Sequence, residues 1–139
     1  MIYLDANVIV SSLLPDAHSE RARAWLDGLS DSLVISDLAA LEAGAVISRN
    51  YRSGDIRKHQ ADGALLDLDA IRAHAHRMRH EEADFALAER LVRDYSTKLA
   101  GPDALHLASA MNARATLATF DARLAAAARG RGVEVAEIG

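Results

Sequence analysis

Four acidic residues in apolar surroundings are the strongest chemical signal in this sequence: Asp5, Glu42, Asp103 and Asp121. A carboxylate in such surroundings is costly unless it is paired or bound to a metal ion. Several carboxylates in one partly desolvated crevice also repel one another, and bound divalent cations are the ordinary solution. Oxygen ligands without cysteine suit Mg²⁺ or Mn²⁺, ions that activate water for attack on a phosphodiester.

Glu42 is the least expected of the four acids. From Leu38 through Ile47 every residue except Glu42 is Leu, Ala, Gly, Val or Ile, so we expect a buried helix there. A carboxylate inside it needs a partner. The alternatives to a metal ion are an ion pair with Arg49 or Arg114, or access to solvent.

Asp103 begins a second apolar segment. Pro102 suits the first turn of a helix, and the acid after it lies beside the positive end of the helix dipole. Between residues 104 and 111 the only polar side chains are His106 and Ser109, three positions apart and so on one narrow stripe of a buried helix.

The elements that position these acids alternate along the chain. We expect strands at 2–4, 33–35, 116–119 and 133–135, and helices at 6–14, 18–29, 38–51, 55–73, 81–95, from Pro102 onward and at 122–129. Residues 74–80 are either a short edge strand or an extended connection. This alternation is typical of a parallel α/β sheet with right-handed crossovers, in which ligands bind beyond the carboxyl ends of the strands.

The predicted sheet directs the four acids to one of its ends. Asp5 and Asp121 each follow a strand, Asp103 starts a helix that packs on the sheet, and Asn7 lies near enough to Asp5 to reach the same crevice. The alternative for the three aspartates is that each only begins a helix, a role worth about 1 kcal/mol or less. Their coincidence with Glu42 favours the metal-binding interpretation.

Length and composition exclude several classes of protein. The 139 residues predict a single domain, 1–139, and the absence of cysteine excludes a disulfide framework or a thiolate zinc site. No apolar run approaches 18 residues and no basic segment precedes the first strand. We therefore expect a cytoplasmic protein that does not insert into a membrane.

Charge is distributed unevenly along the chain. The net charge is −4, yet residues 49–80 hold seven Lys or Arg against four Asp, together with four of the six histidines. This basic window could contact the backbone of RNA, with Arg49, Arg52, Arg57 and Arg77 as candidates. His74, His76 and His80 alternate as metal ligands on a strand would, but a solvated basic edge is the better interpretation.

The motifs together resemble those of PIN-domain ribonucleases, and more narrowly of VapC-type toxins of bacterial toxin–antitoxin modules. The resemblance spans the chain and is carried by Asp5-x-Asn7, Glu42, the run from Asp103 to Ala110 (DALHLASA) and the ending Thr119-Phe-Asp121-x-Arg-Leu. It implies a PIN-like three-layer fold, with a central parallel sheet of four to five strands flanked by helices, typically in a homodimer.

The same resemblance implies an activity. Asp5, Glu42, Asp103 and Asp121 would be the metal-binding catalytic acids, supported by Asn7 and Thr119. Cleavage of RNA would depend on Mg²⁺ or Mn²⁺, and a VapB-type antitoxin would control it. The alternatives are a PIN-like binding protein without catalysis and a PIN nuclease that processes RNA outside a toxin–antitoxin pair.

Two other classes that place an acid after the first strand fit less well. A haloacid-dehalogenase-like phosphatase needs a second Asp where this chain has Asn7, and a downstream lysine, whereas only Lys58 and Lys98 are present. A receiver domain needs adjacent acids after the first strand and a phosphorylatable aspartate about fifty residues later. This chain has only Asp55 in that region, in a turn.

Overall fold

The structure, a computed structural model, describes residues 1–139 and has a four-stranded parallel sheet at its centre. The strands are β1 (Ile2–Leu4), β2 (Leu33–Ser36), β3 (His76–Met78) and β4 (Thr116–Ala118), in the order β3-β2-β1-β4. The predicted α/β class and strand number are therefore confirmed.

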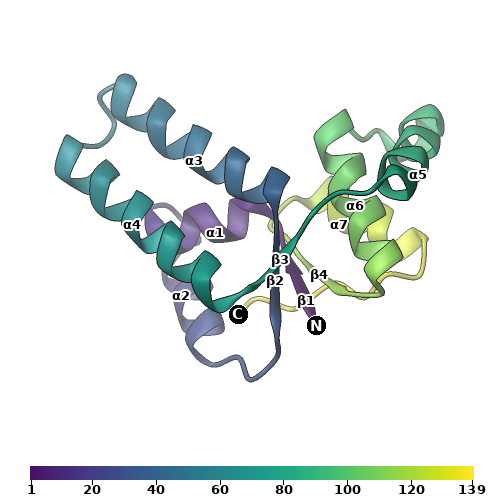
Figure 1. Cartoon of the computed structure of the whole chain (residues 1–139), viewed down its shortest axis with the longest axis horizontal. Helices are drawn as coiled ribbons and strands as arrows, with labels where there is room; N and C mark the ends of the chain where they lie inside the picture. Colours follow the sequence, from purple (N-terminus) through teal and green to yellow (C-terminus); the bar gives the residue numbers. More distant parts are fainter.

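Seven α-helices cover the sheet in two layers (Figure 1). They are α1 (Ala6–Leu13), α2 (Ser19–Asp27), α3 (Asp37–Arg52), α4 (Lys58–His74), α5 (Glu82–Arg93), α6 (Gly101–Ala113) and α7 (Ala122–Gly130), with a short 3₁₀ helix at Tyr95–Thr97. The first four helices lie on one face, and the last three lie on the other. No helix is long and apolar enough to cross a membrane.

Alternation within the strands builds two separate cores. In β1, Ile2 and Leu4 pack with α1, α3 and α4, whereas Tyr3 faces α6 and α7 with Val34 of β2. Strands β1, β2 and β4 are thus largely buried on both faces, which explains their mostly apolar sequences, whereas the edge strand β3 is polar and mainly exposed. The three-layer arrangement follows directly.

Helix α3 is less buried than its composition predicts. Leu41 is 70% exposed and Ala45 is also exposed, because α3 extends beyond the sheet and packs mainly against α1 and α4, with fewer contacts to β2 and α6. The expectation of burial all round the helix is wrong. Glu42 accordingly lies at a partly open position, at the edge of the cavity described below.

The structure settles one segment that the sequence left open and corrects two predicted elements. Residues 76–78 of the ambiguous segment form the edge strand β3, parallel to β2. The predicted strand at 133–135 is wrong as a strand, since it makes only one parallel bridge, between Leu117 and Val135. Helix α4 begins at Lys58 instead of Asp55 because Arg57 is its N-cap, and the Arg57 backbone N–H donates to Gln60 Oε1 (2.9 Å).

Candidate active site

The four acids predicted to converge line one cavity beyond the carboxyl ends of β1 and β4. The cavity has a volume of about 520 Å³ and is also lined by Asn7. Parallel strands end at a common edge, so the turns after β1 and β4 bring Asp5 and Asp121 together. The start of α6 contributes Asp103, and the second turn of α3 contributes Glu42.

Asp5 is the most buried acid of the cluster, with 5% of its surface exposed. It occupies the N-cap position of α1, yet its side chain caps no backbone N–H. Its Oδ2 instead accepts a hydrogen bond from Thr119 Oγ1 (2.7 Å). Burial raises the pKa of Asp5, while His106 and the Thr119 hydroxyl act in the opposite direction. The interpretation of Asp5 as a simple helix cap is therefore wrong.

Thr119 connects the turn after β1 to the turn after β4. Besides donating to Asp5, its Oγ1 accepts hydrogen bonds from Asn7 Nδ2 (3.2 Å) and from the Asp121 backbone N–H (3.0 Å). Asn7 Oδ1 in turn accepts from the backbone N–H of Phe120 (3.1 Å). Asn7 and Thr119 thus fix the two acid-bearing turns relative to each other.

Asp103 and Asp121 differ in what else they do. Asp121 Oδ1 accepts from the backbone N–H groups of Arg123 (2.8 Å) and Leu124 (3.0 Å), so it caps α7 as well as lining the cavity. Asp103 lies in the first turn of α6, and no side chain caps that helix. Burial raises the pKa of Asp103, and the carboxylates of Asp5 and Asp121 raise it further.

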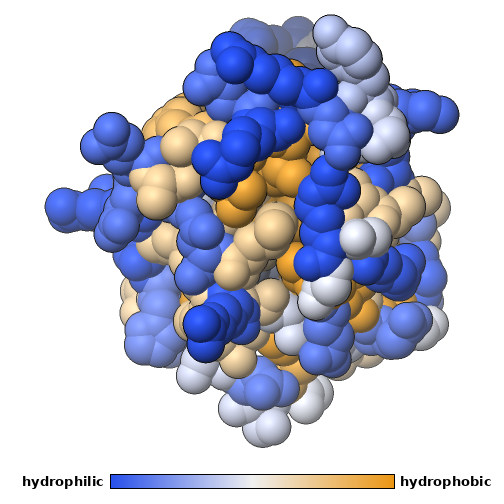
Figure 2. All heavy atoms as spheres, turned by 90° about the vertical axis from the view of Figure 1, so that its right-hand side faces the viewer, coloured by the Kyte–Doolittle hydropathy of each residue, from blue (hydrophilic) through white to orange (hydrophobic).

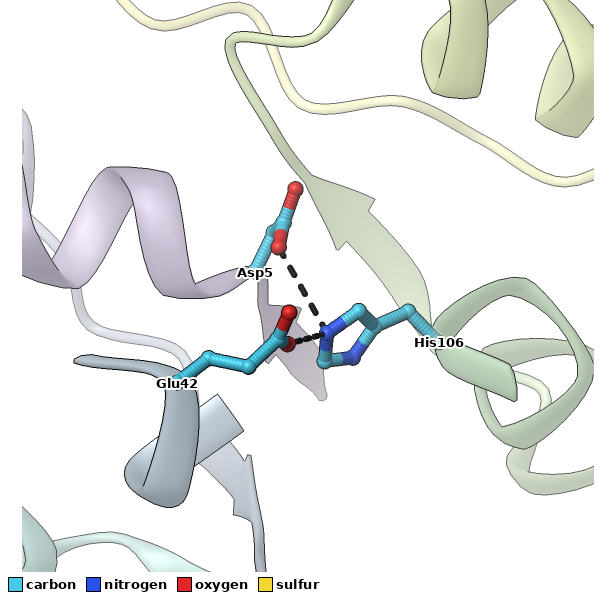
Figure 3. A group of neighbouring side chains, drawn as sticks. All are labelled: Asp5, Glu42 and His106. Atoms are coloured by element: carbon cyan, nitrogen blue, oxygen red, sulfur yellow. Dashed lines mark hydrogen bonds and ion pairs between the residues drawn. The ribbon is translucent and has the colours of Figure 1, made fainter. Parts of the chain in front are cut away.

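Glu42 reaches across the cavity to a buried histidine (Figure 3). Its Oε1 contacts Nε2 of His106, which is fully buried and also lies 3.7 Å from Asp5 Oδ1. The imidazole therefore lies between two acids from different elements. The predicted alternative of an ion pair between Glu42 and Arg49 or Arg114 is wrong, because the partner is this histidine.

A buried polar chain supports His106 from behind. The Nδ1 atom of His106 lies 2.6 Å from the hydroxyl oxygen of Tyr3, and the Tyr3 hydroxyl donates a hydrogen bond to Ser36 Oγ (2.7 Å). Ser36 Oγ also caps α3, because it accepts a hydrogen bond from the Ala39 backbone N–H (3.0 Å). Burial raises the pKa of Tyr3 above its ordinary value, so the phenol stays protonated. No buried side-chain nitrogen or oxygen in the structure lacks a partner.

Sequence reasoning missed the role of this chain of residues. In the sequence His106 is visible only as a polar interruption of an apolar helix, and that interruption is the available signal. Nothing in the local sequence around Tyr3 indicates that it contacts His106, 103 positions away, or Ser36, 33 positions away.

The donor set fits a divalent cation. One ligand atom each from Asp5, Glu42 and His106 lies within 4.8 Å of the other two. Asp103 and Asp121 face the same cavity and bring further carboxylate oxygens. Hard oxygen donors suit Mg²⁺ and Mn²⁺, and an imidazole beside them is a better ligand for Mn²⁺ than for Mg²⁺.

The candidate arginines of the basic window do not line this cavity. Arg49 and Arg52 belong to the last turn of α3, and Arg57 precedes α4. Arg77 forms a bidentate ion pair with Asp37, with nitrogen–oxygen distances of 2.7 and 3.2 Å. The predicted RNA contacts would therefore have to lie outside the acid cavity.

The histidines of the same window are not clustered as ligands. His74 Nδ1 lies 2.9 Å from the carbonyl oxygen of Ala70, and His80 Nδ1 lies 2.9 Å from Ser109 Oγ. Burial lowers the pKa of His80. Both rings therefore have hydrogen-bond partners within the fold.

Fold and site together define an α/β protein with an acidic cavity suited to divalent cations at the carboxyl edge of a parallel sheet. The sequence model of the PIN domain matches residues 2–130. The chain therefore belongs to the PIN domain family. A search of curated protein sequences found no match.

Solved structures with the same fold include bacterial toxins and toxin–antitoxin complexes. VapC20 of Mycobacterium tuberculosis, described as a toxin that cleaves the sarcin–ricin loop, is 19% identical with a TM-score of 0.75, covering 91% of this chain and 95% of the other. VapBC2 of Rickettsia felis, solved with a promoter DNA fragment, is 18% identical with a TM-score of 0.72 and 98% of both chains covered. FitAcB of Neisseria gonorrhoeae is 23% identical with a TM-score of 0.70, covering 99% and 97%.

Proposed function

We propose that this protein is a metal-dependent endoribonuclease and the toxin of a type II toxin–antitoxin pair. The observation that carries the proposal is the cavity lined by Asp5, Glu42, Asp103 and Asp121. A family match over residues 2–130 and the fold shared with VapC20, described as a toxin that cleaves the sarcin–ricin loop, support it. The cofactor would be Mg²⁺ or Mn²⁺, and the substrate would be RNA.

Each acid has a role that follows from its position. Asp5, Asp103, Asp121 and Glu42 would hold the cation, which when bound supplies the Lewis acidity that activates water and offsets charge on the phosphate. Asp5 is kept in one orientation by Thr119, and Glu42 by His106. Asn7 and Thr119 keep the turns after β1 and β4 in register, so the carboxylates stay aimed at one point.

A binding protein without catalysis is the main alternative. Its difficulty is energetic, because four carboxylates around one cavity repel one another in the absence of a cation, and a scaffold with no need of metal gains nothing from keeping them. A nuclease that processes RNA outside a toxin–antitoxin pair would use the same site, so only the partner distinguishes it.

The partner proposed for this toxin is a VapB-type antitoxin. The fold shared with the toxin–antitoxin complex VapBC2 supports this. The test is to co-express the chain with the protein of the neighbouring reading frame and to ask whether the two co-purify and RNA cleavage stops. An isolated chain that no neighbouring protein inhibits would favour the RNA-processing alternative.

A homodimer is also proposed, with its contact on the α5–α6 face. Figure 2 shows an apolar strip between hydrophilic side chains on this side of the molecule. Its groove of about 480 Å³ is lined by Leu38, Phe85, Val92 and Leu105 among others, and Phe85 is 57% exposed. Phe85→Glu should produce a monomer in sedimentation, whereas Leu66→Glu on α4 should not. A monomeric parent protein would contradict the assignment.

The decisive experiment is cleavage of a mixed RNA substrate by purified protein with Mg²⁺, with Mn²⁺ and with EDTA. Cleavage should require metal and be abolished by Asp5→Asn, while the exposed control Asp31→Asn should cleave normally. Circular dichroism establishes that each variant is folded. Cleavage that persists in EDTA or in folded Asp5→Asn would overturn the proposal.

A further inference from the structure

A stacked pair of rings lies at the acid cavity and has no role in holding a cation. The rings of His18 and Phe120 are 4.4 Å apart and nearly parallel, at 13°. The guanidinium carbon of Arg21 lies 5.5 Å from the centre of the Phe120 ring, and Arg21 also contacts His18 Nδ1. Both rings line the same cavity as the four acids, and both are half-buried.

The hydrogen bonds that hold the turn after β4 in place also position Phe120. It lies between Thr119 and Asp121, and its backbone N–H donates to Asn7 Oδ1 (3.1 Å). The residue therefore moves with the turn that carries two of the site's side chains. A ligand group held against Phe120 would be fixed relative to Asp121.

His18 is fixed from the other side by the turn between α1 and α2. Its backbone N–H donates to Asp16 Oδ1 (2.7 Å), and Asp16 Oδ2 accepts from Ser11 Oγ (2.8 Å). Ser19 fastens the same turn, with its hydroxyl donating to the Leu14 carbonyl oxygen (2.6 Å). The ring pair is thus anchored at both ends, a preorganised flat surface instead of two mobile side chains.

The charges around the cavity favour an uncharged contact with the substrate. Five acids line it, including Asp16, and no lysine or arginine does; His18 is the only basic side chain among the lining residues. A phosphate next to the scissile one would find no arginine or lysine in the cavity. Planar rings, by contrast, attract the face of any base, and base–aromatic stacking tolerates every sequence.

We propose that His18 and Phe120, with Arg21 beside them, form a stacking site for one unpaired nucleobase next to the scissile phosphate. The inference rests on the proposed ribonuclease function and adds a substrate feature to it: the RNA must offer a single-stranded base. Stacking of one base is worth about fivefold to a hundredfold in affinity.

The test measures binding separately from cleavage. Two cleavage-resistant 2′-O-methyl phosphorothioate strands of equal length are titrated onto the protein with Mg²⁺, one carrying bases and one abasic throughout. The ratio of their dissociation constants reports contacts to bases alone. We expect the parent protein to prefer the base-bearing strand, and His18→Ala and Phe120→Leu each to reduce that preference by at least fivefold while abasic binding stays unchanged.

Controls separate stacking from folding and from charge. Phe120→Leu keeps the apolar packing that Phe120 makes with the core, and thermal melting verifies each variant. Arg23→Ala removes one charge from an exposed position of α2, the helix that also carries Arg21. This variant should keep the preference for the base-bearing strand. The fluorescence of a 2-aminopurine base in the strand should be quenched when the parent protein binds, and quenched less by His18→Ala and by Phe120→Leu.

Three outcomes would overturn the stacking site. If the ring variants keep the full preference for bases, or weaken both strands equally, then the rings are structural or contact the backbone. In either case RNA cleavage by the parent protein would leave the proposed function standing. If the parent protein neither binds the strands nor cleaves RNA, the ribonuclease assignment fails together with the stacking site.

Discussion

Removing one charge from the acid cluster should stabilise the metal-free protein, and Asp103→Asn is the best change for this test. Burial raises the pKa of Asp103 from its ordinary value of 3.8, and the Asp5, Asp121 and Glu42 carboxylates raise it further against the opposing effect of His106. The folded protein therefore holds the Asp103 proton more tightly than the unfolded chain does. At neutral pH its ionised form destabilises the fold.

The expected size follows from two opposing contributions. Relief of the repulsion that the Asp5, Asp121 and Glu42 carboxylates exert on Asp103 should contribute about 1 kcal/mol, because solvent screens part of it at this half-exposed side chain. Loss of a favourable charge in the first turn of α6 costs about 0.3–1 kcal/mol. We expect a net gain of about 0.5 kcal/mol, or an increase of roughly 1–3 °C in the melting temperature.

The assay is thermal melting of both proteins in EDTA and in millimolar Mg²⁺, across pH. The advantage of Asp103→Asn in EDTA should be full at neutral pH and should disappear as the pH falls below the ordinary aspartate pKa of 3.8, where the carboxyl group is protonated in both the folded and the unfolded state. Magnesium should stabilise the parent protein more than the variant. Glu82→Gln, an exposed acid in the first turn of α5, is the matched control and should not be stabilised.

The result that refutes this reasoning is specific. If Asp103→Asn melts lower than the parent protein in EDTA at neutral pH and gains as much from Mg²⁺, then Asp103 only begins a helix. The four acids would then line one cavity without interacting strongly enough to need a cation.

Three further outcomes are expected. Tyr3→Phe should lower the free energy of unfolding in urea by about 1–3 kcal/mol, because Ser36 and His106 lose a buried partner; an unchanged value would contradict this. Thr119→Val removes the donor to Asp5, so the pKa of Asp5 should rise further and the acidic limb of the cleavage profile should move to higher pH, not stay in place. Saturating Mg²⁺ at a hundred times its Kd should stabilise the parent protein by about 2.7 kcal/mol, and a melting curve insensitive to metal would exclude a built cation site.

The sequence by itself determined the positions of the four acids and the order of the elements, apart from the open segment 74–80 and the strand wrongly predicted at 133–135. Continuous apolar runs such as 2–4 indicate strands buried on both faces, and helices between them require parallel crossovers, so the sheet and its binding edge follow. Asp5 and Asp121 could be placed at that edge because each comes within three residues after the end of a strand. These are local properties of the chain, and the structure agrees with them.

Only the tertiary structure decided how each acid is held. The contacts of Glu42 with His106 and of Asp5 with Thr119 join residues 64 and 114 positions apart, and no local pattern specifies them. The exposure of Leu41 was likewise invisible, because composition does not show that α3 extends beyond the sheet. Local periodicity fixes which residues form an element, whereas the packing of elements fixes which side chains meet, and the chemistry of this site depends on the second.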